Sequence, residues 1–145
     1  VVPLDEVAEY VRQAWNTCGL DVDGNRRLRH VAYDPRLFET LAVGLSDEGV
    51  PMLEYPQSPE RMIPACAHGY SMIVTERVVH DEDPVLARHV TGAQKRHSES
   101  GWTLTKKRAE DGGRHIDGCI ALVMLLHAID TVQLITGPVP AFAFT

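Results

Sequence analysis

Two aspartates stand where an α/β protein gathers its functional side chains. Asp34 follows the apolar segment 28–33 and precedes Pro35, and Asp117 opens a long apolar segment. In α/β folds, the carboxyl ends of strands and the nearby helix ends collect functional groups at one edge of the sheet. Two carboxylates that meet there repel each other unless a cation offsets their charge. The two positions therefore suggest a divalent metal site.

The chemistry of the ligands narrows the choice of metal but does not establish the site. Carboxylate oxygens are hard ligands, so the ion would be Mg²⁺ or Mn²⁺ rather than zinc. A plainer interpretation is also available, because Asp before Pro is common in turns and Asp in a first helical turn complements the helix dipole. Spacing alone leaves both interpretations open and favours the capping roles.

Other groups of chemically active residues give weaker signals. His80, Asp81, Asp83 and His89 resemble a loose ligand cluster, but they lack the spacing of a zinc motif. We expect the acids to cap a helix and His89 to pack half-buried. The chain has neither GxxxxGK[ST] nor GxSxG, so it shows no sign of an ATPase phosphate loop or a nucleophile elbow.

The periodicity of the first half predicts a strand–helix–strand unit after an opening helix. Apolar residues at helical spacing predict a helix over Leu4–Thr17, ended by Gly19. The segments 28–33 and 50–55 read as short strands, and the helix between them closes near Gly49. Such strands are parallel with a right-handed connection, which places Asp34 at the carboxyl edge of the sheet.

The second half predicts helices and one hairpin. We expect a helix from Ser58 to Val74 and a short helix after the acidic segment 81–83. The segment 93–107 reads as a hairpin with its second strand near 102–107, and 116–135 as a long buried helix ended by Gly137-Pro138.

Composition favours one soluble domain over residues 1–145, with 136–145 as a C-terminal tail. The 145 residues are 44% hydrophobic and 23% charged, which is ordinary for a globular protein. The net charge of −6 repels a nucleic-acid backbone unless basic residues gather on one face or metal ions intervene. Lys106 and Lys107 lie in the tightest basic run and could contact phosphates, although a solvated surface is the more common role.

The cysteines and the absence of a long apolar segment indicate where the protein is located. Cys18, Cys66 and Cys119 are far apart and odd in number, so we expect reduced thiols that serve as small core residues. The longest apolar run, 119–126, is too short to cross a bilayer, and no leader is recognisable. We therefore expect a soluble, intracellular protein. The start at Val1, directly before a helical pattern, suggests a fragment or a processed product.

Five segments in order resemble the large terminase subunits of tailed phages. They are VAYDPRLF at 31–38, PQSPERM at 56–62, HDEDPVLARHV at 80–90, TLTKK at 103–107 and HIDGCIALVMLLHA at 115–128. Each motif alone is weak, but five in the right order are much more specific. The resemblance covers about Leu4 to Ala128.

The resemblance implies an α/β fold of the ribonuclease H-like kind, in which a sheet is flanked by helices. It also implies a DNA endonuclease that uses divalent ions held by acids. Asp34 and Asp117 match two of those catalytic, metal-binding aspartates, and Lys106 or Lys107 matches a lysine before the last acidic motif. The implied partners are double-stranded DNA, the terminase ATPase domain, the portal and the small terminase, during genome packaging in the cytoplasm of the bacterial host.

The chain departs from the family pattern at its start. The family's first catalytic aspartate lies on an opening strand, before the helix with which this chain begins, so the expected sheet is truncated at its N-terminal strands. We therefore expect little or no nuclease activity from this chain alone, and oligomerisation through the exposed sheet edge. Two alternatives stay open, namely a non-catalytic prophage remnant or binding module, and another ribonuclease H-like nuclease such as a resolvase.

Overall fold

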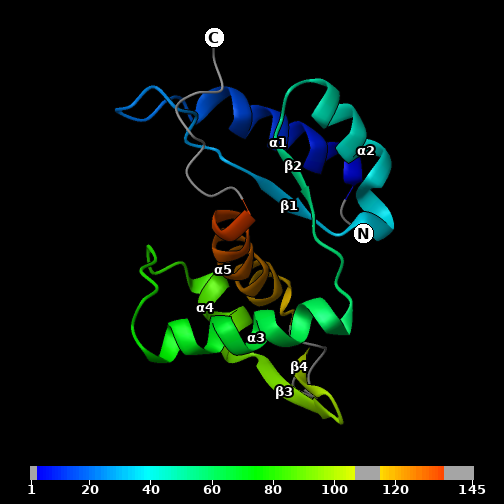
Figure 1. The fold of residues 1–145 in the computed structure, drawn as a ribbon, viewed down its shortest axis with the longest axis vertical. Helices are drawn as coiled ribbons and strands as arrows, with labels where there is room; N and C mark the ends of the chain where they lie inside the picture. The colour runs from blue at the N-terminus through cyan, green and yellow to red at the C-terminus, as the bar shows by residue number, and fades with distance from the viewer. Residues whose placement is uncertain (1–2, 107–114, 136–145) are drawn as a thin grey trace. The chain divides into compact units, whose positions relative to one another are not determined.

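The computed structural model describes residues 3–106 and 115–135, which form a mixed α/β arrangement as the sequence predicts (Figure 1). Two compact units divide the chain, unit 1 over Val1–Gln57 and unit 2 over Ser58–Thr145. Unit 1 holds α1 (Leu4–Thr17), β1 (Val31–Tyr33), α2 (Pro35–Asp47) and β2 (Met52–Glu54). Unit 2 holds α3 (Pro59–Val74), α4 (Pro84–Thr91), β3 (Ala93–Ser98), β4 (Gly101–Lys106) and α5 (Asp117–Ile135). Lys107, the predicted helix stop at Gly137-Pro138 and the tail 136–145 lie outside the described residues.

Unit 1 confirms the predicted strand–helix–strand unit. β1 and β2 are parallel, with Val31 opposite Met52 and Tyr33 opposite Glu54. Both strands are shorter than predicted. The pairing begins where the Val31 N–H donates to the Pro51 carbonyl at 2.9 Å, and Pro51 has no N–H with which to extend the ladder.

The core of unit 1 lies between the two helices and the two strands. Ala8 of α1, Leu45 of α2 and Val50 before β2 form its buried centre. Partly buried apolar side chains surround them, namely Val11, Trp15, Val31, Phe38, Leu41 and Met52. The helix α1 has the predicted bounds and is followed by Gly19 at φ +66°, a left-handed conformation that glycine adopts without strain. This packing holds α2, and with it Asp34, against the strands.

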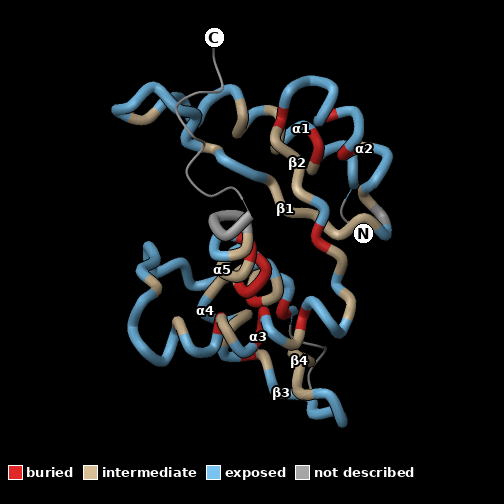
Figure 2. Tube along the Cα trace, viewed as in Figure 1, coloured by how far each residue is buried: buried red, intermediate tan, exposed pale blue. Residues whose placement is uncertain are grey.

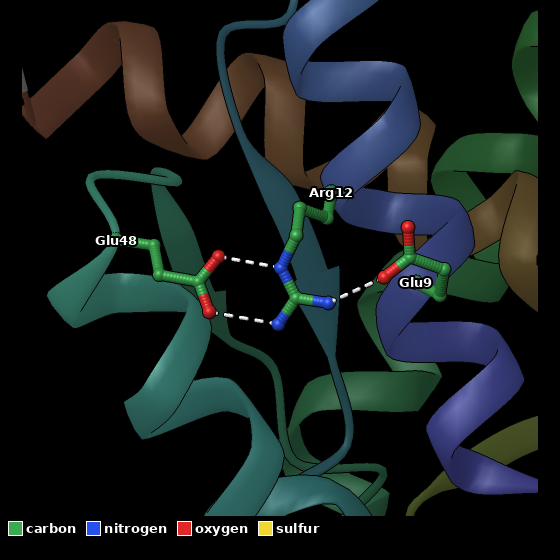
Figure 3. A network of polar contacts seen from close by, with 3 residues as sticks. All are labelled: Glu9, Arg12 and Glu48. Carbon is green, nitrogen blue, oxygen red and sulfur yellow. Dashed lines mark hydrogen bonds and ion pairs between the residues drawn. The ribbon is translucent and has the colours of Figure 1, made fainter.

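A guanidinium fork ties α1 to the end of α2 at the surface of unit 1 (Figure 3). Arg12 donates through Nε and Nη2 to the two carboxylate oxygens of Glu48, at 2.5 and 2.7 Å, and through Nη1 to Glu9 at 2.7 Å. The hydrogen bonds raise the pKa of Arg12 and lower the pKa of Glu48. Exposed ion pairs contribute little stability, so the fork mainly fixes the direction in which the two helices meet.

In unit 2, α5 packs on α3 and α4, and α3 also packs on β4. Figure 2 shows buried positions along α3 and α5, and they include Met62, Ala65, Cys66, Cys119, Val123, Met124 and Ala128. The predicted long helix is confirmed, but it is not buried along its whole surface, because Leu125 and Ile129 are 52% and 46% exposed. The described neighbours of α5 cover only part of its apolar circumference. No helix in the described ranges is both long and apolar enough to span a membrane.

The predicted hairpin is confirmed, and a cation holds it to α3. β3 and β4 are antiparallel and are joined at Ser98 opposite Gly101. The Lys95 ammonium lies 4.0 Å from the centre of the Tyr70 ring and 4.4 Å from that of Trp102. Tyr70 belongs to α3, so this cation–π contact joins both strands to the helix.

The cysteine prediction holds at two of three positions. All three are free thiols, and Cys66 and Cys119 are buried in unit 2. Burial raises the pKa of both buried thiols, which disfavours the reactive thiolate. Cys18 is exposed, so its assignment to the core is wrong. It is the cap residue after the last turn of α1, and the buried residue of that helix, Ala8, lies several turns earlier.

The α3–α5 contact generates a test of the packing. A Cβ added at Gly69 would lie 2.7 Å from Val123 Cγ1 and 3.1 Å from Val123 Cβ. We predict that Gly69→Ala lowers the free energy of unfolding by roughly 1–3 kcal/mol, because the helices must separate. Gly44→Ala in α2 is the control, since an added Cβ there would meet no atom within 4 Å apart from the adjacent helix backbone. It should stabilise the protein by roughly 0.5–1 kcal/mol. Urea unfolding followed by circular dichroism measures both, and equal stabilisation by the two changes would contradict the packing.

Candidate metal centre

Asp34 lies at the junction between β1 and α2, as the sequence predicts. Its backbone is extended, with φ −82° and ψ 121°, and its Oδ1 accepts a hydrogen bond from the Arg36 N–H at 3.2 Å. Pro35 dictates this geometry, because proline favours an extended residue before it and fits the first position of a helix. Asp34 is therefore the N-cap of α2, and the capping role that spacing favoured is real.

The carboxyl edge of β1 and β2 is acidic beyond Asp34. The Tyr33 hydroxyl donates to Glu39 Oε2 at 3.1 Å, and Glu54 stands opposite Tyr33 in the parallel register. Burial raises the pKa of Tyr33, and the carboxylates of Glu39 and Glu54 raise it further. Glu54 is a candidate that the sequence reading missed. The sequence could have indicated Glu54, because the last residues of two parallel strands lie at the same edge of the sheet. Glu54 ends β2 as Tyr33 ends β1.

Asp117 is the first residue of α5 in unit 2, again as predicted. Its side chain is 75% exposed, and its Oδ2 lies 3.4 Å from Nδ1 of His115. At the N-terminus of a helix, the partial positive charge of the peptide dipoles favours a carboxylate. The Asp117 side chain therefore lies at an accessible position at the start of α5.

His89 and Asp83 take the structural roles expected of them. Asp83 caps α4, since its Oδ1 accepts from the Leu86 and Val85 N–H groups at 2.8 and 2.6 Å, and these bonds lower the pKa of Asp83. His89 is half-buried and accepts a hydrogen bond through Nδ1 from the Gly118 N–H at 2.9 Å. The histidine thus contacts the residue next to Asp117.

The candidate residues belong to different parts of the chain. Asp34 lies in unit 1, whereas Asp117 and Lys106 lie in unit 2. Lys106 is the exposed last residue of β4, opposite Ala93. Within the described ranges, no three side chains of His, Cys, Asp or Glu form a group that could hold a metal ion.

Comparison with known proteins identifies the family. The family described as the terminase large subunit, endonuclease domain, matches residues 16–131, well over half of the chain. The chain belongs to this family. The matched range includes Asp34, Lys106 and Asp117. Membership favours the terminase interpretation over another ribonuclease H-like nuclease such as a resolvase.

A solved structure agrees on the fold. The chain is similar to the crystal structure of the HK97 bacteriophage large terminase, with a TM-score of 0.64 and 23% sequence identity. The similarity covers 88% of this chain and 25% of that one, so the chain spans about a quarter of the length of that terminase. This likeness confirms the predicted class of fold. No curated protein matches the chain in sequence.

The two roles of Asp34 can be separated by substitution. We predict that Asp34→Ala lowers the free energy of unfolding by about 1 kcal/mol, because the Arg36 N–H loses its acceptor. Asp34→Asn should leave stability almost unchanged, since asparagine caps helices as well as aspartate does. Thermal and urea unfolding measure both variants. If the asparagine variant lost as much stability as the alanine variant, the carboxylate charge rather than the cap would be what the fold requires.

Proposed function

We propose that this chain is part of a metal-dependent, terminase-type DNA endonuclease in which Asp34 and Asp117 are catalytic residues that bind metal. The observation that carries the proposal is the family match over 16–131, which includes both aspartates. Their positions support it, because Asp34 directly follows a parallel strand and Asp117 begins a helix, the places where such folds present functional groups.

The two carboxylates suit a hard divalent cation. The capping bond of Asp34 uses Oδ1 and leaves Oδ2 for a further ligand, and the Asp117 side chain is accessible. Oxygen donors of this kind favour Mg²⁺ or Mn²⁺. When bound, such ions activate a water molecule and neutralise charge on the scissile phosphate. The chain's own contribution is to hold each carboxylate at the start of a helix, Asp34 before α2 and Asp117 in α5.

Double-stranded DNA is the proposed substrate, and the hairpin offers it positive charge. Arg96 and Lys106 are exposed on β3 and β4, and we assign Lys106 a phosphate contact. Lys107, the neighbouring candidate, lies outside the described residues. A basic hairpin lets a protein of net charge −6 approach a DNA backbone.

The proposal also includes the partners of the protein and its location, both suggested by the family. The partners are the terminase ATPase domain, the portal and the small terminase, and the place of action is the cytoplasm of the bacterial host.

Within the described part of unit 1, β1 pairs with β2 alone. The other edge of β1 is the proposed site of pairing with a second chain. Low nuclease activity of this chain alone stays a prediction.

One observation favours a second candidate, a non-catalytic binding module. The Asp34 carboxylate already caps α2, so its presence has an explanation without a metal ion. Under this alternative, Asp34 and Asp117 are helix-end residues only, and removing their charges leaves metal affinity unchanged.

Calorimetric titration with Mn²⁺ separates the two functions. We predict weak binding by the unmodified chain that falls by roughly tenfold or more in Asp34→Asn and in Asp117→Asn, because each removes a charged ligand. Asp34→Asn keeps the helix cap, so its loss of binding cannot be ascribed to unfolding. Asp47→Asn, at the exposed end of α2, is the matched control and should bind as the unmodified chain does. Equal binding by all four proteins would favour the binding module.

A further inference from the structure

The residue that precedes the helix α5 cannot cap it with its side chain. The Ile116 carbonyl accepts from the Ile120 N–H at 3.0 Å, so Ile116 occupies the N-cap position. Its side chain is a hydrocarbon, buried to 3% exposure, and cannot accept a hydrogen bond. The first N–H groups of a helix need partners from outside the helix.

His89 supplies that partner from another helix. Its Nδ1 lies 2.9 Å from the Gly118 N, in a part-buried contact that joins residues 29 apart in the sequence. Gly118 is the second residue of α5, the position whose N–H an N-cap side chain commonly satisfies. The His89 imidazole on α4 therefore caps the start of α5, just as the Asp83 carboxylate caps the start of α4.

The fit between these two residues depends on glycine. A Cβ at residue 118 would lie 2.8 Å from His89 Nδ1 and 3.5 Å from Leu86 Cδ1. The ring of His89 thus occupies the space that a side chain at 118 would need. This steric observation explains, independently of the hydrogen bond, why glycine follows Asp117.

We propose that His89 is a positioning residue for Asp117, a role that rests on the proposed metal site. The N–H of Gly118 belongs to the peptide unit that leaves Asp117, so a bond to that N–H fixes the plane of this peptide. The plane in turn fixes the direction in which the Asp117 side chain leaves the backbone. His89 acts through the backbone of Gly118 and has no direct role toward the substrate.

The bond also determines the tautomer of the ring. Nδ1 can accept from Gly118 only when it carries no proton, so the ring proton resides on Nε2. An acceptor also suits the positive end of α5, whereas a second donor at Nδ1 would oppose the N–H groups there. The tautomer can be read directly from the ¹⁵N chemical shifts of the imidazole.

Two substitutions test the role. His89→Asn keeps an acceptor, because the asparagine Oδ1 branches from the same carbon as the histidine Nδ1, and His89→Leu keeps bulk but has no acceptor. We expect the Gly118 amide to exchange with solvent roughly three- to tenfold faster in the leucine variant and to stay protected in the asparagine variant. The Val123 amide is the internal control for an intact α5. Mn²⁺ should broaden the Gly118 resonance in the unmodified and asparagine chains and broaden it less in the leucine chain.

The outcomes distinguish this proposal from the proposed function. Equal exchange at Gly118 in all three chains would overturn the role of His89. Faster exchange in the leucine variant together with equal Mn²⁺ broadening in all three would overturn it as well, because Asp117 would then bind metal without the positioning bond. Faster exchange with no Mn²⁺ effect in any chain would support the positioning contact and refute the metal site.

Discussion

The N–H groups at the start of each helix, which have no partner within the helix, are the constraint on which the positions of both aspartates depend. Every helix must find acceptors for its first turn, and the positive end of its dipole favours carboxylates there. In α2 the acceptor is Asp34 itself, and in α5 it is His89, which leaves the Asp117 carboxylate outside the cap. The need to cap a helix therefore positions the two aspartates in two different ways. Asp34 combines a cap with its proposed metal role, whereas Asp117 is relieved of capping by a second helix.

Close packing around α5 makes the capping of this helix by His89 possible. Gly69 lets α3 approach Val123 of α5, and Gly118 lets the His89 ring approach the start of the same helix. Both contacts are too tight for a β-carbon. Buried side chains of α3 and α5 complete the core of unit 2, so the start of α5 is fixed by packing as well as by hydrogen bonds. Changes at these glycines should thus disturb the Asp117 region even though neither residue carries a functional group.

Local patterns were enough to predict the elements and the places of both aspartates. Apolar periodicity, Asp-Pro and the glycine stops determine the five helices, the parallel pair and the hairpin among the described residues. The lengths of β1 and β2 and the one-sided burial of α5 were not predictable, because they depend on which neighbours are present. The bond from Gly118 to His89 was also missed, because no local rule pairs residues 29 apart. The exposed position of Cys18 likewise depends on the packing of α1 and not on residue type.

We propose that Asp34 and Asp117 are both metal ligands. An anomalous diffraction map from crystals of this chain soaked in Mn²⁺ tests it most directly. We predict metal density at the carboxylate oxygens of Asp34 and of Asp117, with the Asp34 bond to Arg36 and the His89 bond to Gly118 retained. The contradicting result is no peak at either carboxylate although both side chains are ordered, and it would make the binding module the better description of the protein.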